Sequence, residues 1–167
     1  ILIFFYNAGT LFSVFCPLIV SISLTSDCFC SKATGWERFD LLKDFFFIHD
    51  YIVKNNLLSE PILIIKLEEA IDHNLNGLIA NQVMSEYRRP VLILTKRQNP
   101  DLNMETWEGS ARGFAINEVD DWRKFIFDSG YAIYAAGHPM AFGVGFTPDK
   151  LEEFRKYCWH RFSAASL

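Results

Sequence analysis

The chain has 167 residues, of which half are hydrophobic and 16 are phenylalanine. This length and composition suit one domain with a buried core, and they exclude disorder over most of the chain. The formal net charge of −4 argues against a general nucleic-acid coat protein, which would be basic, but it leaves room for a local basic groove.

Residues 1–26 carry no charged side chain. The run is long enough for a membrane-spanning helix, which needs about 20 apolar residues, yet Gly9 and Pro17 interrupt it and no basic segment precedes it. Three interpretations stay open: a membrane or signal segment, a buried part of an incomplete domain, or a tail outside the fold. The first residue is not Met, which favours a truncated or abnormally joined chain. A polar linker ends this N-terminal segment, residues 1–35.

Residues 36–58 are predicted to form a connector helix. Its apolar positions near one face are Phe39, Leu42, Phe46 and Val53, widened by Phe45, Ile48 and Ile52. A face this broad must pack against something large. His49 and Asp50 lie within this helix, and we interpret them as structural because no third ligand stands at metal spacing.

A strand, a helix and a second strand follow. Residues 62–67 and 91–95 are continuous apolar runs, typical of strands that are buried on both faces. Residues 75–87 have helical periodicity, and Arg89-Pro90 ends that helix because a residue before proline avoids the helical region. The three elements together predict a βαβ unit.

The C-terminal half is predicted to alternate strands and helices. The sequence predicts a polar loop at 96–108, a strand at 112–116 entered through a glycine turn, and a helix at 117–128 that is capped by Asn117 and stopped by Gly130. Strands at 131–135 and 142–146 follow, and Thr147-Pro148 opens a last helix. The predicted fold class is α/β: a central, mostly parallel five-stranded sheet with flanking helices, forming a domain over residues 59–162.

Two glycine-centred motifs are the strongest functional signals. Gly109, Ser110, Ala111 and Arg112 offer backbone N–H groups, a hydroxyl and a guanidinium that can bind two phosphate oxygens at once. Gly137 and His138 follow a predicted strand, at the end where open α/β sheets bind ligands, and an imidazole there can bond a phosphate. Each motif has an ordinary structural explanation on its own. Their occurrence together favours a phosphate or nucleic-acid backbone site.

Other chemistry finds little support. The four cysteines form neither a disulfide framework nor a zinc pattern, because Cys28-x-Cys30 lacks a second ligand pair. We interpret them as free thiols of a reducing compartment and expect a cytoplasmic protein. Trp107, Trp122 and Trp159 could stack on bases, but aromatic residues are so common here that we expect most of them in the core. Arg88 and Arg89 are candidates for a basic track, although a solvated helix end is the simpler interpretation.

Four segments, taken in order, resemble a known family. They are residues 76–83, 87–94, 109–112 and 136–143, and they are similar to the C-terminal, DHH-associated domain of the RecJ-like single-stranded-DNA exonucleases. The resemblance covers roughly residues 60–157 and implies the substrate-binding half of a two-domain phosphoesterase. It also implies that Arg112 and His138 face the nucleic-acid backbone, across a cleft from a manganese-bearing catalytic domain.

The chain departs from the family pattern at three points. Gly113 stands where the family often has Ser, and Ala136 replaces the first glycine of a Gly-Gly-His motif. No Asp-His-His triplet occurs in the chain. In such phosphoesterases a metal ion generates the nucleophile at neutral pH. We therefore expect manganese or magnesium to be held by a catalytic domain that this chain lacks, and we expect no cofactor in this chain.

The sequence thus predicts a single-stranded nucleic-acid backbone-binding domain that binds rather than cuts. One alternative is a phosphoesterase or oligonucleotide hydrolase that works with a catalytic DHH domain, supplied upstream or in trans. A second is a membrane-tethered or vestigial binding protein that uses residues 1–26 as an anchor.

Overall fold

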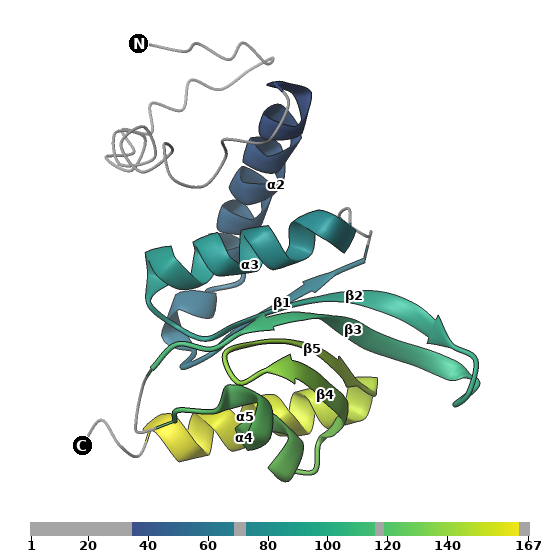
Figure 1. Ribbon diagram of the computed structural model, residues 1–167. Helices are drawn as coiled ribbons and strands as arrows, with labels where there is room; N and C mark the ends of the chain where they lie inside the picture. Colours follow the sequence, from purple (N-terminus) through teal and green to yellow (C-terminus); the bar gives the residue numbers. More distant parts are fainter. Residues whose placement is uncertain (1–34, 69–72, 116–118, 164–167) are drawn as a thin grey trace. The chain divides into compact units, whose positions relative to one another are not determined.

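The computed structural model describes residues 35–68, 73–115 and 119–163 (Figure 1). The chain divides into two compact units, residues 1–38 and 39–167, and nearly all the described residues belong to the second. The predicted N-terminal segment therefore lies almost wholly outside the described residues, and the domain boundaries proposed above stay predictions.

Five strands form one sheet in the order β1-β2-β3-β5-β4. The strands are β1 (Leu63–Leu67), β2 (Val91–Asn99), β3 (Met104–Arg112), β4 (Ala132–His138) and β5 (Ala141–Phe146). The helices are α2 (Gly35–Lys54), the short 3₁₀ helix η1 (Leu57–Ser59), α3 (His73–Tyr87), α4 (Trp122–Asp128) and α5 (Pro148–Ser163). The α/β class and the five-stranded sheet are confirmed.

The prediction of a mostly parallel sheet is wrong. β1 and β2 pair in parallel around α3, which confirms the βαβ unit, but the pairings β2–β3, β3–β5 and β5–β4 are all antiparallel. The cause is a hairpin where the sequence predicted a polar loop at 96–108. The Asn99 side chain accepts hydrogen bonds from the backbone N–H groups of Asp101 (3.0 Å) and Leu102 (3.1 Å), which tightens the turn. β2 and β3 therefore run on to this turn as paired strands.

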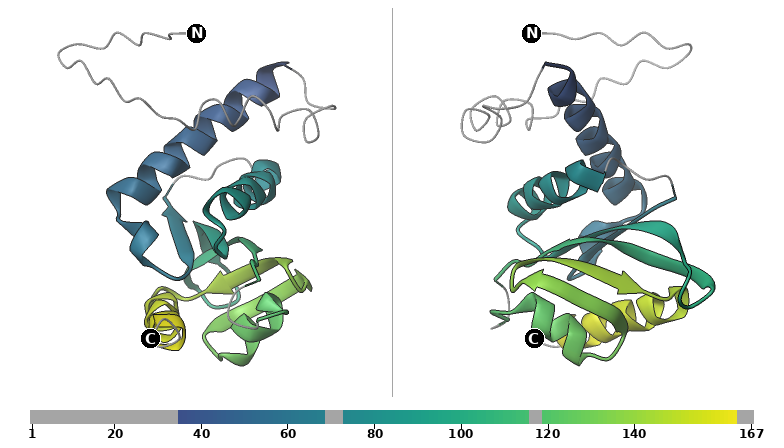
Figure 2. Two further views of the ribbon diagram at one scale, coloured as in Figure 1. Left: turned by 90° about the vertical axis from the view of Figure 1, so that its left-hand side faces the viewer. Right: turned by 45° about the vertical axis from the view of Figure 1, so that its right-hand side comes forward.

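Helices cover the two faces of the sheet unequally. α3 packs on one face, over β2 and β3, whereas α4 and α5 lie on the other face (Figures 1 and 2). The core on the α5 face contains Leu92, Leu94, Ala111, Phe142, Val144, Phe146, Leu151 and Phe154. On the α3 face, Leu63, Ile65, Val91 and Ile93 are buried with Ile79 and Val83 of α3.

The buried face of α2 is narrower than the predicted one. Phe45, Ile48 and Ile52 are buried as predicted, but Phe46 and Val53 are more than half exposed. Seven apolar positions spread around a helix leave its buried side ambiguous in the sequence. His49 bonds to the Tyr87 hydroxyl, in keeping with a structural role.

The shorter C-terminal elements also differ in part from their predictions. α4 begins at Trp122, and its cap is Asp121, whose carboxylate accepts a hydrogen bond from the Lys124 N–H at 2.7 Å. Asn117 lies outside the described residues. Gly130, at φ 74°, ends α4 as predicted, and α5 begins at Pro148. The strand predicted at 112–116 is wrong, because Arg112 is the last residue of β3.

Candidate functional site

The two glycine-centred motifs lie on strands, with β5 between them. Arg112, at the end of β3, pairs with Ala141 of β5, and His138, at the end of β4, pairs with the same Ala141. Residues paired in this way project to the same face of a sheet. Neighbouring strands are about 4.8 Å apart, so the Cα atoms of Arg112 and His138 are separated by roughly 10 Å. The register thus places the arginine and the histidine on one face of the sheet, with Ala141 between them.

A second row of this face is built from small residues. Ser110 pairs with Gly143, and Gly143 pairs with Ala136. A Cβ added to Gly143 would meet its nearest atoms at 3.8–3.9 Å, the Tyr134 Cε2 among them, so there is room for a methyl group above this glycine. The sheet therefore presents a shallow surface between Arg112 and His138, with no large side chain in the row beside them.

Packing against α3 holds the Arg112 guanidinium. A Cβ added to Gly77 of α3 would lie 2.7 Å from Arg112 Nη2, so this glycine makes the room that the guanidinium fills. Arg112 Nη1 donates to the Ala111 carbonyl at 2.8 Å. Burial lowers the pKa of Arg112, yet a guanidinium stays charged at neutral pH. Among the described residues no other hydrogen bond of this guanidinium is found, so its remaining N–H groups can serve an anion.

His138 is the last residue of β4 and stands at the start of an anchored turn. The turn after it is tied down by two backbone hydrogen bonds, from Gly113 N–H to the Met140 carbonyl (2.9 Å) and from Arg123 N–H to the Pro139 carbonyl (3.1 Å). The His138 side chain is exposed. A fixed backbone and an exposed imidazole together suit a group that meets a ligand from outside the domain.

The glycines of the motifs have packing roles in the sheet. A Cβ on Gly109 would overlap the Ile93 carbonyl oxygen, and a Cβ on Gly137, which has φ 134°, would come within 3.0 Å of the Ala141 carbonyl oxygen. β3 is also paired on both sides, so its backbone N–H groups serve the sheet rather than a ligand. The chemistry available from the first motif is therefore the Ser110 hydroxyl and the Arg112 guanidinium.

The two departures from the family pattern have simple structural counterparts. A Cβ on Gly113 would overlap the Trp122 ring, so this position is shaped by a buried tryptophan. Ala136 is exposed and adds only a methyl group to the open row. Neither change disturbs the placing of Arg112 or His138.

Arg88 and Arg89 have different surroundings. Arg89 Nη1 donates to the backbone carbonyls of Leu58 (2.5 Å) and Glu60 (2.6 Å), which ties the segment after α3 to η1. Arg88 is exposed and has a left-handed backbone, with φ 51°. Both hydrogen bonds come from Nη1, so they fix the Arg89 side chain and leave its other N–H groups for a ligand, and the basic track stays a prediction.

Sequence reasoning missed several residues around the site. Asn76, next to Gly77, is 4% exposed, and its Oδ1 finds no hydrogen-bond partner within the described residues. Tyr134 and Glu108 form a third row of the same face, paired through Gly145. The alternation of Gly143 and Gly145 with large apolar residues along β5 was the available signal that one face of the strand is uncovered.

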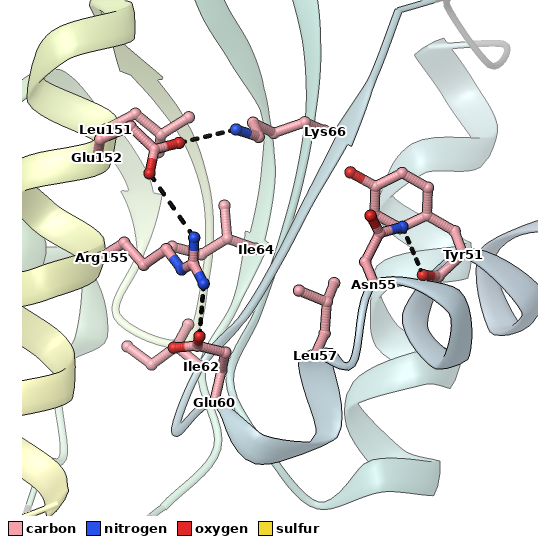
Figure 3. A pocket seen from close by; sticks show the side chains of 10 residues that line it. All are labelled: Tyr51, Asn55, Leu57, Glu60, Ile62, Ile64, Lys66, Leu151, Glu152 and Arg155. Atoms are coloured by element: carbon pink, nitrogen blue, oxygen red, sulfur yellow. Dashed lines mark hydrogen bonds and ion pairs between the residues drawn. The ribbon is translucent and has the colours of Figure 1, made fainter.

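A small pocket of about 150 Å³ lies elsewhere, between β1, η1 and α5 (Figure 3). Its charged side chains pair with one another: Lys66 with Glu152 at 2.8 Å, and Arg155 with Glu60 at 2.7 Å. The pocket therefore offers no uncompensated charge to a ligand, and neither motif lines it.

The residues that the structure describes contain no group of three His, Cys, Asp or Glu side chains that could hold a metal ion. They also contain no helix that is long and apolar enough to cross a membrane. Residues 1–26, the proposed anchor, lie outside this part of the chain.

The chain is similar to two curated proteins over 120 residues, with 34% identity to each. They are the "Putative SPbeta prophage-derived single-strand DNA-specific exonuclease YorK" of Bacillus subtilis (strain 168) and its namesake in Bacillus phage SPbeta. The match covers 72% of this chain but 20% of each relative, so the chain spans about one fifth of their length. No family model matches.

A solved structure is also similar, that of RecJ in complex with Mg²⁺ from Thermus thermophilus. The match has a TM-score of 0.42 and 16% identity, and it covers 72% of this chain and 18% of that one.

Proposed function

Since this chain is related to the RecJ-like single-strand DNA-specific exonucleases and corresponds to their C-terminal domain, we propose that it binds the backbone of single-stranded DNA. The observation that carries this proposal is the shared register of Arg112 and His138 on either side of Ala141. It brings a guanidinium and an imidazole, the two side chains best suited to phosphate in the motifs, to one open face.

Each residue of the proposed site has a separate role. Arg112 donates two N–H groups to one phosphate, because its planar fork matches two phosphate oxygens. Ser110, in the next row on the same strand, donates its hydroxyl to the same or the following phosphate. His138 contacts the phosphate nearest to a catalytic domain that reaches this face from outside.

Metal chemistry is not part of this role. The described residues supply no set of carboxylates or imidazoles that fits a manganese or magnesium ion, so no step is assigned to a metal in this chain. We propose that the metal ions belong to a catalytic DHH domain, supplied upstream or in trans. In that arrangement the present chain positions the strand, and the partner domain cleaves it.

Salt-dependent binding of a fluorescent oligothymidylate to the full chain tests this proposal. Binding through phosphates releases counterions, so affinity should fall as salt rises, and Arg112→Ala should reduce the slope of log K against log salt by about 1. Lys156→Ala is the matched control, because Lys156 is exposed on α5, the helix on the opposite face of the sheet.

Three outcomes would overturn the proposal. The chain could fail to bind at low salt, or Lys156→Ala could reduce the slope as much as Arg112→Ala does. Release of nucleotides by the purified chain in the presence of manganese would contradict the binding-only role and support the hydrolase alternative.

A further inference from the structure

A tyrosine ring lies flat on the same open face, two rows from His138. Tyr134 of β4 pairs with Gly145 of β5. A Cβ added to Gly145 would lie 2.5 Å from Tyr134 Cε1 and 3.0 Å from Cδ1, so the ring occupies the space that a side chain on β5 would fill. The Tyr134 hydroxyl reaches Glu108 of β3, at 3.4 Å from Oε2. The side chain therefore crosses β5 and lies along the sheet surface.

Hydrogen bonds fix this orientation from the β3 side. Glu108 Oε1 accepts from the Thr106 hydroxyl at 2.9 Å and from Asn99 Nδ2 at 3.5 Å, which leaves Oε2 for Tyr134. Burial and the Glu108 carboxylate both raise the pKa of Tyr134, so its hydroxyl keeps its proton and donates at neutral pH. The hydrogen bond to Glu108 holds the hydroxyl end of the ring, and the backbone of Gly145 supports the ring face that lies on the sheet.

The chemistry of this row suits a base better than a phosphate. The Glu108 carboxylate on the same face repels phosphate and opposes the attraction of the Arg97 guanidinium, which also acts on Tyr134, whereas the partly exposed aromatic ring offers a stacking surface that any base can use. Tyr134 and His138 are four residues apart on one strand, so their Cα atoms lie roughly 13 Å apart along the face. The small residues Ala136 and Gly143 lie between them and leave the path clear.

We propose that Tyr134 is a stacking platform for a nucleobase of the strand whose phosphates are held at Arg112 and His138. The inference rests on the proposed function and adds a base contact to a site otherwise built for the backbone. It also assigns to Tyr134 the stacking role that the sequence suggested for tryptophans. Trp107 and Trp122 are buried in the core, whereas Trp159 is exposed on α5, the helix on the opposite face of the sheet.

The test compares two oligonucleotides of equal length, an oligothymidylate and an abasic strand with the same number of phosphates. The full chain should bind the strand with bases more tightly. Tyr134→Leu should weaken oligothymidylate binding by about fivefold or more, the lower end of the effect of removing a stacked aromatic ring, and leave abasic binding unchanged. Tyr134→Phe, which keeps the ring, should retain most of the preference.

A second variant moves the ring without removing it. Gly145→Ala places a methyl group where the Tyr134 ring lies, so the ring must tilt off the sheet, and the base preference should fall while the protein stays folded. Phe127→Leu, a change of an exposed aromatic residue on α4, should leave both affinities unchanged and serves as the control.

The results separate this inference from the proposed function. If the unmodified chain binds neither oligonucleotide, backbone binding itself fails, and the stacking role fails with it. If the chain binds both strands equally, or if Tyr134→Leu keeps the base preference, the stacking role alone is overturned. Arg112→Ala should weaken both strands alike, because it removes a phosphate contact.

Discussion

The two halves of the sheet differ in how many of their faces are covered by helices, and this difference shows where a ligand can bind. In the closed half, β1 and β2, neighbouring residues such as Ile64 and Ile65 or Leu92 and Ile93 are all buried, because helices cover both faces. In the open half, large buried residues of β5 alternate with glycine and alanine, and every residue of β4 is at least partly exposed. A strand covered on one face leaves every second residue available, and on that face His138 of β4 and Arg112 of β3 flank Ala141.

Charged side chains also differ between two places on the sheet. Beside β1, Lys66 and Arg155 are each paired with a glutamate. Arg112, on β3 at the border of the open half, donates to the backbone carbonyl of Ala111, and His138 is exposed on β4. A cation that the fold neutralises contributes to stability, whereas a guanidinium without a carboxylate partner among the described residues can attract a polyanion.

The largest expected difference in the free energy of unfolding lies between substitutions at two paired residues, one on β2 and one on β3. Ile93 is fully buried, and its register partner Ser110 belongs to the open face. Ile93→Ala should lower the free energy of unfolding by about 2–5 kcal/mol, because it leaves a cavity in the closed half. Ser110→Ala should change it by less than about 0.5 kcal/mol. Urea unfolding followed by tryptophan fluorescence measures both, and equal effects would erase the distinction between the halves.

A larger side chain at Gly143 on the open face should lower the affinity for oligothymidylate without preventing folding. A Cβ on Gly143 would make only ordinary contacts, with the Tyr134 ring at 3.9 Å, so Gly143→Val should fold with a small shift of that ring, and valine suits a strand better than glycine does. Its side chain would stand in the row between Ser110 and Ala136, so oligothymidylate affinity should fall by about tenfold, or 1.4 kcal/mol. Unchanged affinity in a folded Gly143→Val variant would show that the strand binds elsewhere.

Local patterns predicted the closed half well and the pairing of the open half poorly. The βαβ unit follows from apolar runs and helical periodicity, which short segments reveal by themselves. The hairpin after β2 escaped prediction because Lys96, Arg97 and Gln98 are exposed, so their strand conformation comes from pairing with β3 rather than from burial. Parallel and antiparallel pairing likewise depends on contacts between distant segments.

The site was predicted residue by residue but not as an arrangement. The types of Arg112 and His138 pointed to phosphate, yet nothing local indicates that one residue, Ala141, pairs with both. Gly77 supports Arg112 from a different element, and Tyr134 acquires its orientation from Gly145 on the neighbouring strand. Such relations come from strand register, which a pattern within one segment does not contain.

The smallest predicted effect concerns the paired charges of the closed half. The hydrogen bond from Lys66 lowers the pKa of Glu152 below its ordinary value of 4.5. A carboxyl whose pKa is lower in the folded chain stabilises it above about pH 4.5, and this contribution disappears as the pH falls through the folded-state pKa. Both side chains are more than a third exposed, so Lys66→Met should cost less than about 1 kcal/mol at pH 7. The difference in Tm between the two proteins, measured from pH 7 to pH 3, should therefore shrink towards zero. A difference that persists at pH 3 would come from packing of the lysine stem rather than from its charge.

The affinity of Lys66→Met for oligothymidylate at pH 7 should stay unchanged, since the charge of Lys66 is already neutralised by Glu152. A loss of affinity as large as that of Arg112→Ala would contradict the division between paired and available cations.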